Sequence, residues 1–441
     1  MTSVRPDTAG ALLGEIAAAQ SEGKLPSVNA GVVRDGSLVW TGSRGRFVTA
    51  DGGAPGPDVQ YRIGSITKTL TALLVMQCRD DGLLALNDAA GKHLPGIAFG
   101  DRTIRHLLAH SGGMNAEPEG PWWERNPGVT FDELTAAMDD SHAVGPADRR
   151  HHYSNLGYGL LGEIVSRLRG ASWLDLVQER ILDPLEIRRT TYFPAEPAAQ
   201  GFSVHPFSGR LVPEPAYDAG AMAPAGQLWS TIEDLAKYAM FWIDPIHEVL
   251  SRESVEEMAS PAAADPREGL TASYGLGLRL IAADPNLLIG HTGSMPGFLA
   301  GLFVDRTRRV GAVTLGNATY GRVASLPPDL IKTLVNYEPV LPQEWVPEPL
   351  LPQGDELLGN WYWGNTPLTI SVSAGILQLS GGLTTRLSPL GPDLYQGRDG
   401  YLAGENLRVI RDGNTISHLN VATFVLTRTP YGLSADDRHQ A

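Results

Sequence analysis

The first part of the chain passes from a helical pattern to a strand pattern. Residues 8–22 have the pattern of a helix, and Gly23 with Pro26 beyond it predicts where that helix ends. Two apolar-rich runs follow within residues 27–45, joined by an Asp-Gly pair at 35–36 that is typical of tight hairpin turns. We therefore expect an N-terminal helix followed by a β-hairpin.

The rest of this region changes pattern once more. Residues 65–260 read mainly as helices with irregular loops. Three strand-like runs punctuated by Gly and Asp follow, namely ASYGLGLRLI, NLLIGHTGSMPG and FLAGLFVDRTRRVGAVTLGN. Strands at both ends with helices between them predict an α+β fold, in which one antiparallel sheet takes strands from the N- and C-terminal parts.

A proline-rich segment separates this region from the end of the chain. Five prolines lie between residues 339 and 352, which is typical of a stiff, extended linker. Beyond it, short alternating strands with Gly, Asp and Asn turns predict a small all-β barrel. We expect a first domain at residues 1–336, a linker at 337–352, a barrel at 353–432 and a disordered tail at 433–441.

Composition and charge narrow the classes of function. The net charge of −14 argues against a nucleic-acid partner, because there is no basic surplus to neutralise phosphates. The single cysteine, Cys78, excludes an internal disulfide framework and lies in an apolar run that favours a buried thiol. No signal-peptide pattern is visible, and no apolar run approaches the roughly 20 residues that span a bilayer. We therefore expect a cytoplasmic protein without a membrane partner.

Ser65 and Lys68 stand three residues apart in YRIGSITKTLTALLVMQC, at the start of an apolar helix. Residues at this spacing are neighbours on a helix, and an apolar environment disfavours the charged form of a lysine. A neutral amine beside a hydroxyl can accept its proton, so Ser65 is a candidate nucleophile. A second Ser-x-x-Lys, formed by Ser21 and Lys24, lies at a polar helix end where the lysine stays solvated. We give it no catalytic role.

Two further motifs strengthen this hypothesis. Tyr153 and Asn155 form the only Tyr-x-Asn in the chain and stand just before a second apolar helix. His291, Thr292 and Gly293 form the only His/Lys-Thr-Gly, at the end of a strand-like run. Taken alone, Asn155 is typical of a helix N-cap and Tyr153 of a buried phenol. Together with the Ser-Lys pair, they indicate a catalytic site.

The three motifs, in this order, resemble the signature of the penicillin-recognising serine enzymes. Over about residues 10–335 the chain is similar to the class C β-lactamase and D,D-peptidase superfamily, particularly its esterase, D-aminopeptidase and penicillin-binding-protein-type thioesterase branches. The C-terminal module resembles the lipocalin-like barrel that some members carry. The resemblance implies a β-lactamase/transpeptidase-like fold and an acyl-enzyme formed without a metal or organic cofactor.

The resemblance also implies how protons move. Ser65 would be the nucleophile, and Lys68 would help to remove its proton. Tyr153 would share the base role and relay protons to the leaving group, for which a phenol needs positive charge beside it. Lys68 and His291 are the two residues expected to supply that charge.

The remaining motif residues would bind the substrate. Asn155 would orient the lysine and bind a substrate amide. The backbone N–H groups of Ser65 and Ser294, next to Thr292 and Gly293, would form the oxyanion hole.

His291 departs from the pattern of many family members, which have a carboxylate-binding lysine at this position. Histidine is shorter and mostly neutral at pH 7. We therefore expect weak activity on β-lactams and better activity on esters, thioesters or amides.

Several other residues are weaker candidates for binding a metal ion or the substrate. His106 and His110 stand four apart on a predicted helix, as metal ligands can, but no third ligand follows at a suitable spacing, so we expect a structural role and no metal site. Trp122, Trp123 and Trp229 are candidates to line the substrate cleft, although core packing is the default for aromatic residues. We keep Trp229 as a substrate-binding candidate.

One candidate lies in the C-terminal module. Arg428, in its last predicted strand, has a fork-shaped donor suited to a substrate carboxylate, and a solvated barrel residue is the alternative interpretation.

These observations predict a serine hydrolase or acyltransferase that acts on a small ester, thioester or peptide, with a D-configured residue implied by the resemblance. The alternative enzyme is a penicillin-binding-protein-type thioesterase that offloads and macrocyclises a nonribosomal peptide, with a carrier-protein-bound peptide as partner. An alternative of another class is a non-catalytic sensor or scaffold with the same fold. The intact set of Ser65, Lys68 and Tyr153 argues against that alternative.

Overall fold

The computed structural model describes residues 3–46, 53–264, 271–283, 285–339 and 354–432, together with residues 341, 344 and 346. The chain forms two compact units, Met1–Val340 and Leu341–Ala441. Most of the expected proline-rich linker and the whole expected tail at 433–441 lie outside the described residues.

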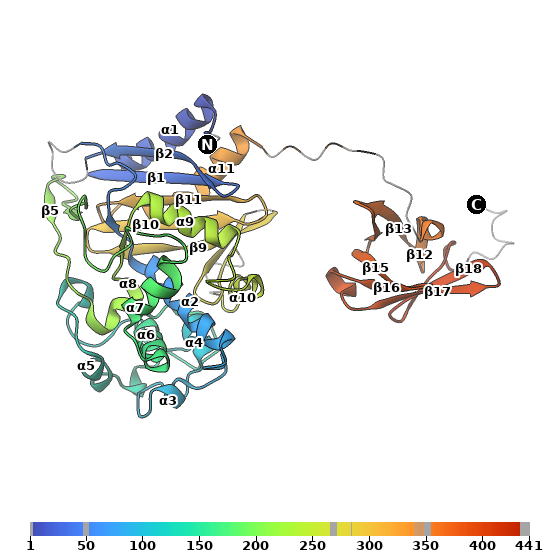
Figure 1. Cartoon of the computed structure of the whole chain (residues 1–441), viewed down its shortest axis with the longest axis horizontal. Coiled ribbons are helices and arrows are strands. Elements are labelled where there is room, and N and C mark those ends of the chain that lie inside the picture. The colour runs from blue at the N-terminus through green and yellow to red at the C-terminus, as the bar shows by residue number, and fades with distance from the viewer. Residues whose placement is uncertain are drawn as a thin grey trace. The chain divides into compact units, whose positions relative to one another are not determined.

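The first unit is built on one antiparallel sheet of seven strands (Figure 1). Across the sheet, the strands follow the order β2 (Ser37–Gly45), β1 (Ser27–Arg34), β11 (Val310–Gly316), β10 (Phe298–Asp305), β9 (Asn286–Met295), β8 (Arg279–Ala283) and β7 (Ala272–Tyr274). N-terminal strands pair directly with C-terminal ones, because Val28 of β1 lies opposite Gly316 of β11. The predicted α+β sheet with strands from both ends of the region is confirmed.

The β1–β2 hairpin follows from its turn residues. Asp35 and Gly36 both have positive φ angles, 48° and 76°, as a tight turn matched to the twist of the strands requires. Aspartate and glycine tolerate this conformation better than other residues.

Two helices from opposite ends of the unit cover one face of the sheet (Figure 1): α1 (Pro6–Glu22) and α11 (Pro327–Tyr337). Leu12 and Ile16 of α1 share a buried apolar cluster with Leu330 and Leu334 of α11. Just beyond α11, Glu338 forms an ion pair with Arg34 of β1 at 2.8 Å. The first unit therefore continues past residue 336, where we expected it to end.

A mainly helical region covers the opposite face. Its longer helices are α2 (Thr67–Asp80), α6 (Asn155–Arg169) and α9 (Ile232–Ile243). The shorter ones are α3 (Ala90–His93), α4 (Ile104–Leu108), α5 (Phe131–Ala136), α7 (Trp173–Val177), α8 (Ala223–Gly226) and α10 (Arg252–Met258). Short strands pair β3 (Tyr61–Arg62) with β6 (Trp229–Ser230) and β4 (Phe202–Val204) with β5 (Leu211–Pro213). These elements and the sheet enclose the larger apolar core.

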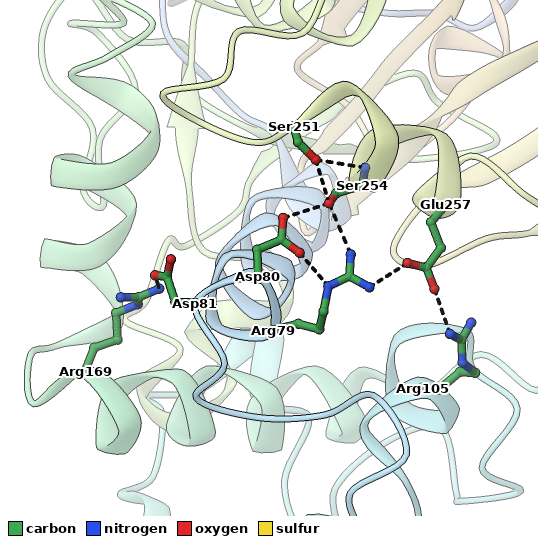
Figure 2. Close-up of polar contacts among 8 residues, drawn as sticks. All are labelled: Arg79, Asp80, Asp81, Arg105, Arg169, Ser251, Ser254 and Glu257. Carbon is green, nitrogen blue, oxygen red and sulfur yellow. Dashed lines mark hydrogen bonds and ion pairs between the residues drawn. The ribbon is translucent and has the colours of Figure 1, made fainter.

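A polar network holds the C-terminal end of α2 (Figure 2). Arg79 donates to Glu257 of α10 at 2.6 Å and to Ser254 at 3.2 Å. Ser254 donates to Asp80 at 2.7 Å, and Arg105 of α4 donates to the second oxygen of Glu257 at 2.7 Å. Glu257 thus joins α10 to both α2 and α4.

The second unit is an eight-stranded antiparallel sheet in which every strand pairs with the next along the chain. Its strands are β12 (Gly359–Trp363), β13 (Thr366–Ser373), β14 (Ile376–Gly381), β15 (Thr385–Gly391), β16 (Leu394–Gly397), β17 (Asn406–Asp412), β18 (Thr415–Val421) and β19 (Phe424–Leu426). Backbone hydrogen bonds in both directions join Tyr362 of β12 to Thr427 just after β19. The sheet is thereby almost closed into a barrel around buried Trp361, consistent with the predicted lipocalin-like module.

Among the helices of the described residues, none combines the length and the apolar character needed to cross a membrane.

Candidate active site

Ser65 and Lys68 lie at the junction of two helical elements. Ser65 is in the short turn η1 (Gly64–Ile66), and Lys68 is in the first turn of α2, which continues directly from it. The α-helix thus begins at Thr67, two residues after the serine where we expected it to start, but the two side chains still meet. Lys68 Nζ lies 2.9 Å from Ser65 Oγ and donates to the Ala225 carbonyl at 2.6 Å. The carbonyl fixes the amine against the serine hydroxyl.

Burial controls the charge of Lys68. The side chain is fully buried, and the loss of solvation lowers its pKa to about 7. The carboxylates of Glu117 and Glu124 act in the opposite direction and keep the pKa from falling further. A substantial fraction of Lys68 is therefore neutral at pH 7, as a general base for Ser65 requires.

Tyr153 stands in the segment that leads into α6, with Lys68 Nζ 5.0 Å from the centre of its ring. Burial raises the pKa of Tyr153, and its side-chain contact with Ser65 opposes that rise. The Tyr153 hydroxyl has no partner with hydrogen-bond geometry among the described residues. It is therefore a protonated phenol close to Ser65 that can donate to a substrate atom.

Asn155 is the first residue of α6, and its environment differs from both expectations. The N-cap is Ser154, whose hydroxyl accepts from the Gly157 N–H. Asn155 Nδ2 donates to Glu117 Oε1 at 2.6 Å, whereas the hydrogen bonds of Lys68 within the described residues go to Ser65 and Ala225. Asn155 therefore does not orient the lysine directly, and it is tied to the segment that contains Glu117.

His291 is held in a neutral form. Its Nε2 lies 2.7 Å from the Tyr274 hydroxyl, and its Nδ1 bonds the Thr292 carbonyl. Since a carbonyl can only accept, Nδ1 carries the proton and Nε2 accepts from Tyr274. Burial, reinforced by nearby Lys68, lowers the pKa of His291 to about 3. The expectation that His291 supplies positive charge beside Tyr153 is therefore wrong.

The end of β9 lies directly against the nucleophile turn. A Cβ atom on Gly293 would lie 1.9 Å from the Ile63 carbonyl oxygen, and one on Gly64 would lie 2.5 Å from the Ser294 nitrogen. Only glycine permits this approach at either position, and Gly64 also has a positive φ of 51°. The backbone segments that contain Ser65 and Ser294 are consequently in close contact.

The expected motifs converge on one pocket of about 260 Å³. Ser65, Tyr153 and all four residues from His291 to Ser294 line it, together with His151, Ala272, Ser273, Tyr274, Arg279, Leu299 and Ala324. Arg279 is the only permanently charged group among these lining residues, and none of them is acidic. The sequence motifs did not reveal Arg279 or Glu117. The signal for Arg279 was the SYGLGL stretch, which ends at the residue before it.

Three other candidates do not line this pocket. Trp229 is buried in the core, with its ring against Phe298, and does not line the pocket. Trp122 and Trp123 lie outside the pocket lining as well, and their indole nitrogens donate to Glu124 and Glu117. Their polar contacts therefore join residues of one loop.

Arg428 is engaged within its own barrel. Its guanidinium donates to the carbonyls of Glu356, Leu358 and Asn360 and lies 3.8 Å from the centre of the Trp361 ring. These contacts fasten the segment after β19 to β12 and to the residues just before it. The geometry thus supports a structural role in place of carboxylate binding.

His106 and His110 do not share a helix, contrary to expectation. Helix α4 ends at Leu108, and His110 lies beyond it with a φ of 55°. His106 instead completes the capping box of α4 with Thr103. No group of three or more potential metal ligands occurs in the part of the chain that the structure describes.

Comparison with protein-family models decides the family. The model described as Beta-lactamase matches residues 13–334. The chain belongs to the beta-lactamase family. Residues 351–428 match a second model, described as a domain of unknown function (DUF7586).

Curated relatives agree with this membership in the beta-lactamase family. Penicillin-binding protein 4 of Amycolatopsis lactamdurans is 30% identical over 341 residues, which cover 72% of this chain and 87% of that protein. Beta-lactamase-like protein 2 of Dictyostelium discoideum is 28% identical over 256 residues, which cover 54% of this chain and 46% of that protein. The chain thus spans about half the length of the Dictyostelium relative.

Among the solved structures of similar fold, some match nearly the whole chain and others match about three quarters of it. The octameric penicillin-binding protein homologue from Pyrococcus abyssi has a TM-score of 0.66 at 24% identity, covering 95% of this chain and 99% of that chain. SurE has a TM-score of 0.62 at 25% identity, covering 96% and 99%. A D-stereospecific amidohydrolase from Streptomyces sp. has a TM-score of 0.61 at 25% identity, covering 75% and 98%. The predicted β-lactamase/transpeptidase-like fold is confirmed.

In this beta-lactamase family member, the geometry allows acyl transfer through a serine. Ser65 and the buried phenol of Tyr153 line one pocket, and the partly neutral Lys68 amine lies behind Ser65, 2.9 Å from its hydroxyl.

Proposed function

We propose that the chain is a serine hydrolase or acyltransferase that forms an acyl-enzyme at Ser65 with small ester, thioester or amide substrates. The observation that carries this proposal is the buried Lys68 amine, 2.9 Å from the Ser65 hydroxyl at the pocket wall. A structural lysine gains nothing from a buried position where part of it loses its charge, whereas a general base does.

The proposed reaction follows from these positions. The neutral amine of Lys68 takes the proton of Ser65 as Oγ attacks the substrate carbonyl carbon. The backbone amides of Ser65 and Ser294 stabilise the oxyanion that forms. The Tyr153 hydroxyl protonates the leaving group as its bond to carbon breaks, and the Lys68 ammonium returns a proton to Tyr153. Water or an amine then attacks the acyl-enzyme.

Charge in the pocket suggests the class of substrate. Among the lining residues His291 is neutral, and Arg279 is the residue that always carries a positive charge. We propose that preferred substrates carry a carboxylate near the scissile bond. A preference for a D-configured residue is supported by the similarity to the D-stereospecific amidohydrolase from Streptomyces sp..

Steady-state kinetics on matched substrates test this proposal. We expect Arg279→Met to raise KM by roughly 10-fold or more for an activated D-amino-acid substrate with a free carboxylate, because one charge-assisted hydrogen bond is lost. The methyl ester of that substrate should be almost unaffected, and Arg279→Lys should restore part of the loss. Equal effects on both substrates, or a similar loss of thermal stability in both variants, would refute carboxylate binding by Arg279.

The second candidate is a thioesterase that offloads and cyclises a peptide bound to a carrier protein. The match to SurE extends over both units of this chain, whereas the match to the amidohydrolase covers 75% of it. The match to SurE supports keeping this second candidate, although the penicillin-binding protein homologue from Pyrococcus abyssi matches both units as well. A peptidyl thioester with a free N-terminal amine distinguishes the two functions, because a cyclase releases a product one water lighter than the hydrolysed peptide.

A further inference from the structure

His110 contacts three consecutive residues of the segment that contains Tyr153. Its carbonyl accepts from the His152 N–H at 2.7 Å, and its Nδ1 accepts from the Ser154 N–H at 3.0 Å. Its ring lies against the ring of Tyr153, with centroids 4.2 Å apart and planes 35° apart. His110 therefore holds the Tyr153 segment in two ways. Its backbone carbonyl binds the preceding residue, and its side chain binds the following residue and packs against the Tyr153 ring.

The backbone at His110 is unusual in a way that serves these contacts. The residue is 2% exposed and has a φ of 55°, a conformation that costs free energy for a residue with a Cβ atom. The chain turns sharply there after α4, and this turn directs both the ring and the carbonyl toward the Tyr153 segment. Such a strained backbone persists only where the surroundings determine it.

The charge state of His110 is fixed by the same surroundings. Because Nδ1 accepts a hydrogen bond, the ring proton is on Nε2, which has no partner among the described residues. Tyr274 and Tyr158 surround the ring at centroid distances of 4.6 and 5.1 Å. Burial is the main cause that holds the pKa of His110 well below its usual range, and Lys68 adds to it. A neutral, rigid ring thus supports one side of Tyr153.

We propose that His110 is a positioning residue that fixes the Tyr153 hydroxyl beside Ser65 and Lys68, and that it acts on the reaction only through Tyr153. This inference rests on the proposed function, because it presumes that Tyr153 transfers a proton during acylation. His110 itself does not line the pocket, so it is not expected to touch the substrate.

A double-mutant cycle in the full chain tests the proposal. The rate constant for acylation of Ser65 by a neutral activated ester is measured for wild type, His110→Ala, Tyr153→Phe and the double variant. We expect His110→Ala to slow acylation roughly 10- to 100-fold, with KM changed less than about 3-fold, because a misplaced phenol costs rate more than binding. In the Tyr153→Phe background, the same change should alter the rate less than about 3-fold.

A second pair of variants separates positioning from folding. Asparagine tolerates a positive φ, and its side-chain oxygen can replace Nδ1 as acceptor for the Ser154 N–H. Glutamine places its amide too far along the side chain for that bond. His110→Asn should therefore retain several-fold more activity than His110→Gln, even if His110→Ala does not fold. His106→Asn is the matched control, because that ring contacts Thr103 and Asp148 instead.

The outcomes distinguish this inference from the proposed function. If the wild type is not acylated at Ser65, the proposed function fails. If Tyr153→Phe slows acylation but His110→Ala slows it equally in both backgrounds, the inference alone is wrong. Equal activity of the Asn and Gln variants would also overturn it.

Discussion

At the scale of single residues, the site depends on which ionisable side chains are held uncharged by burial. Lys68 is buried and partly neutral, His291 is buried and neutral, and Tyr153 keeps its proton. Desolvation is the largest cause of all three shifts, because each group leaves water for a tightly packed interior. The result is one base, Lys68, beside a histidine and a tyrosine that both remain uncharged at pH 7.

The first prediction concerns the pH dependence of the reaction. Lys68 accepts the Ser65 proton only when it is neutral, and its pKa is about 7. We expect kcat/KM for a neutral ester to fall as the pH drops through about 7, with a slope of one proton. The measurement is a pH–rate profile from pH 5 to 9. Lys68→Arg, which stays charged throughout, is the control for loss of the base. A flat profile below pH 7 would contradict the role of Lys68.

The sequence alone identified the site residues whose motif partners lie within a few positions in the chain. Ser65 and Lys68 are three apart, so helix geometry alone brings them together. Glu117 and Asn155 are 38 residues apart, and nothing local indicates that their side chains meet. The hydrogen bond at His291 Nε2 comes from Tyr274, which reaches it from another strand. Such contacts require the tertiary fold.

At the scale of elements, the site lies where η1 packs against the end of β9. The predicted α+β arrangement followed from strands at both ends of the region, and the periodicity of β1 and β9 was visible in the sequence. The helix predicted through His110 was wrong because the chain turns into a left-handed conformation there. That turn is stabilised by residues distant in the sequence, and the hydrophobic periodicity of the local sequence gives no information about them.

The second prediction concerns the contact between η1 and β9. In Gly293→Ala, the new methyl group would overlap the Ile63 carbonyl, 1.9 Å from its Cβ. Relieving that overlap must move Ser65 away from the Ser294 amide. We expect at least a 100-fold loss of kcat and a destabilisation of about 2 kcal/mol. Acylation kinetics and urea unfolding measure the two effects. Gly14→Ala, where a Cβ meets nothing within 4 Å, is the control. Retained kcat would contradict this account of the site.

The third prediction concerns the far end of α2. Glu257 accepts from Arg79 and Arg105, and these partners hold its pKa below the usual range although burial opposes them. We expect Glu257→Gln to lower the free energy of unfolding by about 1 kcal/mol, a modest value because the network is partly exposed to solvent. Ser65 acylation should change less than 3-fold.

Glu256→Gln is the control for this network, since Glu256 is more exposed and lies 3.7 Å from Arg306. Thermal and urea unfolding of both variants provide the comparison. An equal effect of the two substitutions would show that the network in Figure 2 does not stabilise the helix.

At the scale of the whole molecule, the chain consists of two units with separate apolar cores. The proline-rich composition and the change to short alternating strands indicated this division in the sequence. The closure of the barrel was less visible, because it depends on Tyr362 and Thr427 at opposite ends of the module.

The fourth prediction follows from these separate cores. Removal of residues 341–441 should leave the first unit folded, because Glu338 and α11 still close it against β1 and α1. Acylation of Ser65 by a small activated ester should stay within about 3-fold of the full chain. Circular dichroism and acylation kinetics measure both properties. A truncated protein that is unfolded or unreactive would show that the first unit depends on the second.

The central claim is that Ser65 carries the acyl group, and mass spectrometry tests it most directly. The full chain is incubated with a fluorophosphonate or an activated ester, digested and mapped, beside Ser65→Ala and Ser21→Ala. The account predicts one adduct, on the peptide that contains Ser65, in the wild type and in Ser21→Ala and none in Ser65→Ala, with all three proteins equally folded. An adduct on another residue, or labelling that survives Ser65→Ala, would contradict it.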